Sequence, residues 1–375
     1  MRSTVVAVMP LAVQMGGAEL NFRQFAQRAS ANGIDLVVVF LECGPMVSEI
    51  EAMGLAAEVI DAGRLRHPAK YITAVAAIRN VIMRAGADGV ISWMAKAHLY
   101  AGPAAALARV PAVWSQSGVP QTNEILSSVA NKLPSKGVIC CSHQAMQAQS
   151  ALRPLRPIRV VYPGADLERF DPEHLASPAE LRQELGLPAH GAVIGVFCRL
   201  QSSKGVEVLI DALALVRRAN DSVHLVVVGG QHAGERGHLA ELVGRVDAQG
   251  LSAHVSMVGH QTDVPRWMNA TSVVCMPSDA TESFGIAVVE AMSLGKPTIA
   301  SLEGGPNEII TDGLDGLLVP FGDPVALAGA ITAVISDERL GAALGEAARL
   351  RAAGFGADAF ASNFTENLLE LLDLA

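Results

Sequence analysis

The chain has 375 residues, of which 50% are apolar, 17% are charged and 4% are aromatic. This apolar fraction excludes an intrinsically disordered protein, and the length is more than twice that of a typical domain, so we expect two domains. The formal net charge of −9 argues against a protein that binds nucleic acid through a generally basic surface, so no nucleic-acid partner is expected.

Short runs of β-branched and apolar residues recur along the chain at intervals that leave room for helices. In the first half, the predicted strands are residues 4–8, 36–41, 89–93, 112–115, 138–141 and 160–162. In the second half, they are residues 193–198, 224–228, 255–258, 272–276, 297–301 and 317–319. Continuous apolar runs are typical of strands that are buried on both faces of a parallel sheet. The sequence therefore predicts an α/β fold.

The first of these runs superficially resembles a secretion signal. Arg2 precedes an apolar run over residues 4–13, but Pro10 interrupts the run and no small-residue cleavage site follows. We therefore interpret it as a buried strand. No uninterrupted apolar run approaches the roughly 20 residues that a membrane-spanning helix needs.

Helical periodicity fills several intervals between the predicted strands. Residues 205–219 place five apolar side chains on one helix face, namely Val206, Leu209, Ile210, Leu213 and Val216. Residues 326–335 show a similar pattern, and residues 355–374 are predicted to form a final helix.

The alternation of strands and helices restarts after a Pro- and charge-rich stretch at residues 163–188. We predict a first Rossmann-like domain over residues 1–163, a linker region over 164–187 and a second Rossmann-like domain over 188–354. The last helix, 355–375, is expected to pack back on the first domain. Two doubly wound α/β domains facing each other across a cleft bind ligands at the carboxyl ends of their strands.

The cysteines and the charge distribution indicate the compartment and the partners. The five cysteines form no C-x-x-C pair, which is typical of reduced thiols in a cytoplasmic protein. Residues 1–165 carry 15 Lys/Arg and 9 Asp/Glu, a net of +6, whereas residues 166–375 carry 13 and 28, a net of −15. This split favours different partners for the two halves. The alternative is an uneven distribution of surface charge that serves no partner.

A candidate phosphate and sugar site follows the strand predicted at 272–276. The next residues, 277–292, read PSDATESFGIAVVEAM and open an apolar helix near Gly285. A glycine at this junction lets a ligand approach the free N–H groups at the positive helix end. Glu282 and Glu290 are poor phosphate ligands but good acceptors for the hydroxyls of a sugar or ribose. A helix-start acid and a solvated side chain are the alternative roles.

Two further segments offer phosphate contacts. Arg199 and Lys204 flank a polar turn after the strand predicted at 193–198, where both can converge on phosphate oxygens; exposed turn cations are the alternative. Gly16 and Gly17 form a glycine turn after the first strand. Neither the G-x-G-x-x-G dinucleotide fingerprint nor a Walker sequence is present, which disfavours a dehydrogenase and an NTPase.

These segments, in this order, resemble the family-4 retaining glycosyltransferases of the GT-B fold over nearly the whole chain. The matching motifs are GGAE at 16–19, VVYPGAD at 160–166, R-x4-KG at 199–205, PS at 277–278, E-x7-E at 282–290, GKP at 295–297 and GGxxE at 304–308. The resemblance implies an acceptor-side first domain and a second domain that binds a nucleotide sugar.

The resemblance also implies roles for the matching residues. Arg199, Lys204 and Glu282 would be the catalytic residues, the two cations holding the donor diphosphate and Glu282 contacting the donor sugar. Glu290 would bind the ribose. The remaining donor-binding positions lie in the glycine turn, beside the nucleobase and at the start of the helix: Gly16, Gly17, Gly259, His260, Ser283, Phe284, Gly285 and Ile286.

One position departs from the family pattern. The family often carries a histidine after the strand predicted at 112–115, and Ser117 stands at that place. His98 lies near another histidine-containing segment of the family. His98 and Ser117 are therefore candidate sugar or acceptor contacts, and a core or rim histidine is the alternative for His98.

The expected reaction is a hexosyl transfer from a UDP- or GDP-sugar to an acceptor hydroxyl, with retained anomeric configuration, in glycan, glycolipid or metabolite biosynthesis. The resemblance implies no cofactor and no metal. A nucleotide-sugar 2-epimerase and a non-catalytic nucleotide-sugar-binding subunit are the alternatives. The basic first half favours an anionic or lipid-linked acceptor, or an anionic membrane surface on which a cytoplasmic protein would dock peripherally. A soluble aglycone is the other candidate.

Overall fold

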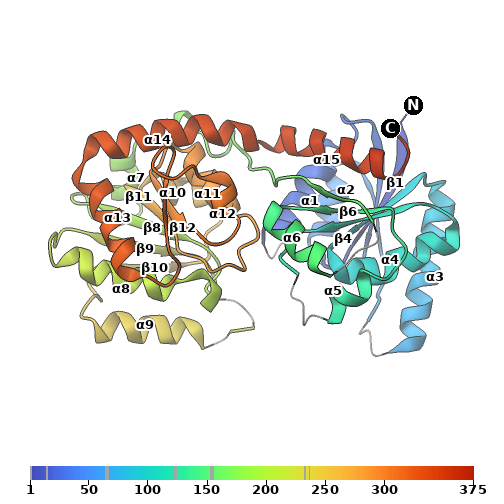
Figure 1. Ribbon diagram of the computed structural model, residues 1–375, viewed down its shortest axis with the longest axis horizontal. Coiled ribbons are helices and arrows are strands. Elements are labelled where there is room, and N and C mark those ends of the chain that lie inside the picture. The colour runs from blue at the N-terminus through green and yellow to red at the C-terminus, as the bar shows by residue number, and fades with distance from the viewer. Residues whose placement is uncertain are drawn as a thin grey trace. The chain divides into compact units, whose positions relative to one another are not determined.

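The computed structural model describes residues 2–13, 16–63, 67–120, 125–152, 156–231, 234–235 and 237–375. The chain divides into two compact units. The first unit comprises Met1–Gly164 together with Ala357–Ala375, and the second comprises Ala165–Gly356. Each unit contains one parallel sheet with helices packed against it (Figure 1).

The first sheet has the strand order β3-β2-β1-β4-β5-β6-β7. Its strands are β1 (Ser3–Met9), β2 (Ile34–Phe40), β3 (Ala56–Val59), β4 (Gly89–Trp93), β5 (Ala112–Gln116), β6 (Gly137–Cys140) and β7 (Ile158–Val160). The central strand β1 pairs in parallel with β2 on one side and with β4 on the other. The order of the strands therefore reverses between β1 and β4, which is the switch point of this sheet.

Helices cover both faces of the first sheet. They are α1 (Gly17–Arg28), α2 (Met46–Ala52), α3 (Pro68–Ala85), α4 (Met94–Ala108), α5 (Ile125–Ala130), α6 (His143–Ala151) and α15 (Ala357–Leu371). Successive residues of β1 point to opposite faces, so Val6 packs with the α3 and α4 side chains and Val5 packs with those of α1 and α15. The last helix belongs to this unit because Phe364 packs on Phe25 of α1, with ring centroids 4.9 Å apart.

The second sheet has the strand order β10-β9-β8-β11-β12-β13. Its strands are β8 (Val193–Phe197), β9 (His224–Val228), β10 (Val255–Gly259), β11 (Val273–Met276), β12 (Thr298–Ser301) and β13 (Leu317–Val319). The pairing is parallel throughout these strands. Here the order reverses between β8 and β11, so the loops after these two strands leave the sheet at its switch point.

The helices of the second unit alternate with its strands. They are α7 (Pro178–Glu184), α8 (Val206–Arg217), α9 (His238–Ala248), α10 (Val264–Asn269), α11 (Ile286–Ser293), α12 (Pro306–Ile309), α13 (Pro324–Ser336) and α14 (Glu338–Ala352), with 3-10 turns η1 (Pro172–His174), η2 (Ser202–Lys204) and η3 (Ala353–Phe355). The predicted apolar face of α8 is confirmed, because all five of its side chains are at most 2% exposed.

The predicted strands agree with the observed strands to within two residues at each end. One strand, β3, was not predicted. It is a short strand at the edge of the sheet, and its sequence AAEV is partly exposed along its whole length. In the described part of the chain, no helix is both long enough and apolar enough to cross a bilayer.

Candidate functional site

Most of the predicted donor-site residues follow the carboxyl ends of β8, β10 and β11. Arg199 and Lys204 follow β8, and Glu282 and Gly285 follow β11. These two loops are neighbours because β8 pairs directly with β11. They flank the switch point of the second sheet, which is where open parallel sheets bind their ligands.

Glycines let the loops of this edge approach one another at backbone distance. A Cβ on Gly205, which has φ +64°, would lie 2.0 Å from the carbonyl oxygen of Pro277. A Cβ on Gly229, with φ +156°, would lie 1.6 Å from the carbonyl oxygen of Cys198. Only glycine fits such positions. The loops after β8, β9 and β11 are therefore held in direct backbone contact.

Lys204 and Glu282 form an ion pair across two of these loops. The ammonium nitrogen lies 2.5 Å from Oε2 of the carboxylate, and the two side chains are 15% and 12% exposed. Charges this deeply buried need a partner, because each would lose most of its hydration. The pair places a cation beside a carboxylate that can accept hydrogen bonds from sugar hydroxyls. Among the described residues Arg199 makes no ion pair, and its residue is exposed.

Helix α11 begins directly after this pair. Gly285 precedes it with φ +93°, and the first-turn N–H groups of the helix face the same loop. Gly305 packs so closely on this loop that its own Cβ would lie 2.2 Å from Cα of Phe284. Its N–H donates to the carbonyl of Glu282 over 2.8 Å. The G-G motif at 304–305 thus holds the Glu282–Gly285 turn in place.

Glu290 lies further along α11 and is partly buried. Burial raises the pKa of its carboxyl to about 8; Arg169 opposes this rise and Asp166 adds to it. A carboxyl that is mostly protonated near neutral pH becomes a stronger hydroxyl acceptor when it ionises.

Replacing Glu290 by glutamine is expected to change how stability depends on pH. The folded protein binds the Glu290 proton more tightly than the unfolded chain does, because its pKa is raised from 4.5 to about 8. This stabilisation is complete below pH 4.5 and is lost as the pH rises to 8, at no more than about 1.4 kcal/mol per pH unit. Urea denaturation at pH 5, 6.5 and 8 should show that wild type loses stability relative to Glu290→Gln. A constant difference between the two proteins would contradict the buried acid.

Gly259 is the last residue of β10, at the end of the second sheet, and His260 follows it. The carbonyl of Gly259 accepts the N–H of Gly229 over 2.9 Å. A Cβ on Gly230 would lie 3.4 Å from Cβ of His260, so the loops after β9 and β10 are also in contact. The structure therefore brings Arg199, Lys204, Gly259, His260 and residues 282–290 to one edge of one sheet.

Gly16 and Gly17 lie in the first unit, where they start α1 beside the switch point of the first sheet. The N–H of Gly16 donates to Oε2 of Glu19 over 2.9 Å, which caps the first turn of the helix. The preceding residues Gln14 and Met15 lie outside the described residues.

His98 is buried in the first unit, with none of its surface exposed. Its Nδ1 lies 2.9 Å from the hydroxyl of Ser92, and its ring stacks on Trp114 with centroids 5.4 Å apart. Burial, with a smaller effect of Arg156, lowers the pKa of His98 to about 4 and keeps the ring neutral. The ring therefore offers no exposed atom to a sugar or an acceptor. Ser117 is partly exposed and lines a cavity of about 10 Å³, which has room for little more than one water.

The loops after β8 to β12 carry most of the predicted donor-site residues, and we call them the predicted donor edge. Sequence reasoning missed two residues that support it. Arg169 is the cation that acts on Glu290, and Glu235 accepts the N–H of Ser202, in the turn before Lys204, over 2.8 Å. Arg169 lies three residues after the VVYPGAD motif, and this proximity is the signal in the sequence that could have identified it. Glu235 had no such signal, because only the fold brings it to Ser202.

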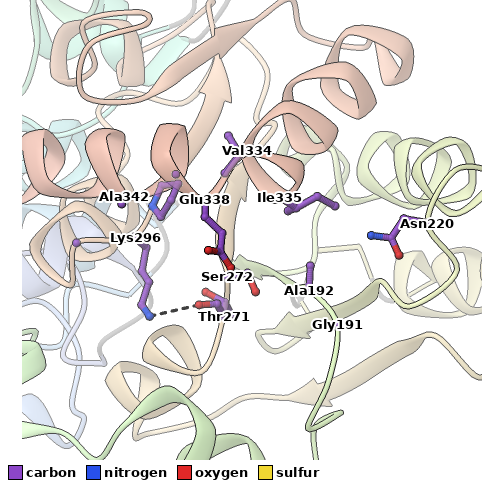
Figure 2. A pocket seen from close by; sticks show the side chains of 13 residues that line it. Gly191, Ala192, Asn220, Thr271, Ser272, Lys296, Val334, Ile335, Glu338 and Ala342 are labelled. Carbon is purple, nitrogen blue, oxygen red and sulfur yellow. Dashed lines mark hydrogen bonds between the residues drawn. The ribbon is translucent and has the colours of Figure 1, made fainter.

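A separate cavity of about 510 Å³ lies at the opposite, amino-terminal edge of the second sheet (Figure 2). Lys296 borders it, and its ammonium donates to the carbonyls of Asn269 and Thr271 over 2.6 and 3.3 Å. These contacts cap the carboxyl end of α10. Burial, with Arg182 nearby, lowers the pKa of Lys296 to about 8. This lysine has a structural role away from the predicted donor edge.

Two families match the chain in tandem. Residues 15–169 match Glycosyltransferase Family 4, and residues 178–351 match Glycosyl transferases group 1. The chain belongs to the family-4, group 1 glycosyltransferases. The second match contains the loops after β8, β9, β10, β11 and β12, where the donor-site residues are predicted.

Curated relatives of this glycosyltransferase include two D-inositol 3-phosphate glycosyltransferases. The protein from Jonesia denitrificans is 37% identical over 205 residues, and that from Corynebacterium jeikeium is 35% identical over 202. Each alignment covers 53% of this chain and 48% of the relative, so the chain spans about half the length of the curated relatives it matches.

Solved structures resemble the chain over nearly its full length. Anabaena HepE in complex with UDP and glucose aligns with a TM-score of 0.86 at 25% identity, covering 98% of this chain and 100% of that one. A glycosyltransferase from Rickettsia africae aligns with a TM-score of 0.87 at 20% identity over 100% of both chains. The predicted GT-B fold, with two Rossmann-like domains, is confirmed.

Proposed function

We propose that this glycosyltransferase moves a hexose from a nucleotide-diphosphate sugar to an acceptor hydroxyl and retains the anomeric configuration. The observation that carries the proposal is the Lys204–Glu282 pair, 2.5 Å apart at the switch point of the second sheet and directly before α11. A cation and a helix start suit a diphosphate, and a carboxylate suits sugar hydroxyls. The family match favours transfer over an epimerase or a silent binding subunit.

In the proposed reaction, the chain's own charges stabilise the leaving group. The bond between the anomeric carbon and the β-phosphate oxygen breaks while the acceptor oxygen bonds to the same face of that carbon. The acceptor proton passes to the departing phosphate. Arg199, Lys204 and the α11 N–H groups would meet the charge that develops on the phosphate, which is where preorganised groups accelerate a reaction most.

Retention without a metal is part of this proposal. Glu282 is engaged by the ammonium of Lys204, which disfavours it as a covalent nucleophile and supports a role in holding the sugar. Arg199 and Lys204 provide the positive charge that a divalent cation supplies in metal-dependent transfer.

For the donor, we propose a UDP-sugar, with a GDP-sugar as the second candidate. HepE, whose solved structure resembles this chain at 25% identity, was crystallised with UDP and glucose. This supports a uridine diphosphate at the edge formed by the loops after β8 to β11.

For the acceptor, we propose a hydroxyl compound that carries a phosphate. The curated relatives are named for D-inositol 3-phosphate, and residues 1–165 have a net charge of +6. Some of this charge is already paired, because Lys70 contacts Asp61 and Lys136 contacts Asp373. Peripheral docking of a cytoplasmic protein on an anionic membrane is the second candidate. It is favoured by the exposed apolar side chains of α5, namely Ile125, Leu126 and Val129.

Incubating the protein with a panel of UDP-, GDP- and ADP-sugars tests the function. We expect one donor to release nucleotide only when an acceptor is present, with a phosphorylated acceptor turned over faster than its dephosphorylated form. The product should keep the donor's anomeric configuration by ¹H NMR, and EDTA should leave the rate unchanged. Vesicles of anionic lipid should raise the rate only if the acceptor is lipid-linked.

The outcomes separate the parts of the proposal. An inverted product or an EDTA-sensitive rate would remove the retaining, metal-independent mechanism but leave transfer standing. Epimerised donor without any transfer, or tight nucleotide binding with no turnover, would refute the proposed activity.

A further inference from the structure

Arg169 links the start of the second unit to the loop that carries His260. Its Nη2 donates to the carbonyl oxygen of Thr262 over 2.5 Å. Thr262 lies two residues after His260, in the loop between β10 and α10. A hydrogen bond from a charged donor to a backbone carbonyl is among the stronger ones, and this one fixes the backbone of the loop.

The segment that carries Arg169 is itself fixed to α11. The hydroxyl of Ser293, on α11, donates to the carbonyl of Phe170 over 3.0 Å, and the Phe170 ring is buried. The guanidinium of Arg169 lies 5.7 Å from the centroid of that ring. Glu290 precedes Ser293 by three residues and shares its face of the helix. Arg169 therefore lies between the His260 loop and the helix face that carries Glu290.

Arg169 is also the cation that acts on Glu290, and Asp166 is the anion. Four of the other cations on or next to elements packed against α11 have partners of their own. Arg266 of α10 pairs with Glu184 and Asp263, Arg349 of α14 pairs with Asp171 and Glu173, and Arg351 of α14 donates to the carbonyls of Glu308 and Ile309. Lys296, just after α11, donates to Asn269 and Thr271.

We propose that Arg169 is a positioning residue that joins the His260 loop and Glu290 into one wall for the nucleoside end of the donor. This inference rests on the proposed function, because it takes Glu290 to bind ribose and the His260 loop to border the base. Without Arg169, the Thr262 carbonyl loses its donor and Glu290 loses its cation. Both changes would weaken nucleotide binding without removing any group that contacts the phosphates.

The link between Arg169 and Glu290 is tested first in the ligand-free protein. The Glu290 carboxyl is followed by ¹³C NMR during a pH titration, with its signal assigned by its loss in Glu290→Gln. Arg169→Gln is expected to move the titration midpoint upward by about one pH unit, and Arg169→Lys to restore most of the wild-type midpoint. The matched control is Arg349→Gln, which removes an arginine paired with Asp171 and should leave the midpoint unchanged. Identical midpoints in wild type and Arg169→Gln would overturn the link.

The role in donor binding is tested by UDP titration at pH 7 and pH 9. Arg169→Gln should weaken UDP binding about tenfold at pH 7 and less at pH 9, where about half of the Glu290 carboxyls are ionised even without Arg169. Arg349→Gln should bind like wild type, and with a functional donor Arg169→Gln should raise KM more than it lowers kcat. A loss of affinity that is equal at both pH values, or absent, would overturn the positioning role. If wild type binds neither UDP nor GDP while the NMR shift is present, the proposed function fails and the link to Glu290 survives.

Discussion

Replacing Lys204 by alanine is expected to lower kcat by a factor of roughly 10²–10³, which is the usual loss when one preorganised charge-stabilising donor is removed. The ammonium would meet the phosphate charge as the sugar leaves, and it lies 2.5 Å from Glu282. Glu282→Ala should lower kcat by a similar factor, because the sugar hydroxyls lose their acceptor. Initial rates at saturating donor measure both effects.

An exposed ion pair in the same unit provides the control for these variants. Arg245 pairs with Asp211 and its side chain is 44% exposed, so Arg245→Ala should leave transfer unchanged. Each single Lys204 or Glu282 variant leaves one buried charge unpaired and should lower Tm, whereas the double variant should recover part of that loss. Transfer at the wild-type rate by a folded Lys204→Ala protein would refute the proposed mechanism.

Gly305→Ala is expected to destabilise the predicted donor edge strongly. The added Cβ would lie 2.2 Å from Cα and 2.4 Å from the backbone nitrogen of Phe284, so no side chain can move aside to relieve the clash. Gly305 has φ −59°, which any residue adopts, so the effect is steric alone. We expect a loss of at least about 1–3 kcal/mol of unfolding free energy, as for other overpacked sites, together with weakened UDP binding. Denaturant unfolding and UDP titration measure the two effects.

Gly329 provides the comparison for this substitution. It lies inside α13, and a Cβ added there would meet no atom within 4 Å. Gly329→Ala should therefore be neutral or stabilise the protein by up to about 1 kcal/mol, and it should not affect UDP binding. If Gly305→Ala behaved like Gly329→Ala, the close packing of the G-G motif on the Glu282–Gly285 turn would be refuted.

The inner strands of both sheets could be predicted because they are buried on two faces and therefore read as continuous apolar runs. The strands that were missed or displaced lack such a continuous apolar run. In β3, Glu58 and partly exposed alanines leave no apolar run to detect. In β7, Arg159 stands between Ile158 and Val160 and interrupts the apolar run. The strand was therefore predicted two residues further toward the C-terminus, over the apolar residues that follow.

The site was predictable only where its chemistry is local in the sequence. Motif spacing placed Lys204 and Glu282 in loops after their strands, but their ion pair joins residues 78 positions apart and needed the fold. The role of Arg169 depends on contacts with Thr262 and the neighbourhood of Glu290, which the sequence does not bring together. His98 could not be placed from the sequence, because both it and the apolar residues beside it on α4 are buried.

A crystal structure of the protein grown with UDP would show whether the loops after β8 and β11 hold the nucleotide. We expect the diphosphate oxygens within hydrogen-bond distance of Lys204 Nζ and of the N–H groups that begin α11, with the ribose hydroxyls on the carboxylate of Glu290. UDP bound elsewhere, for example in the cavity beside Lys296 at the opposite edge of the sheet, would refute the proposed donor site.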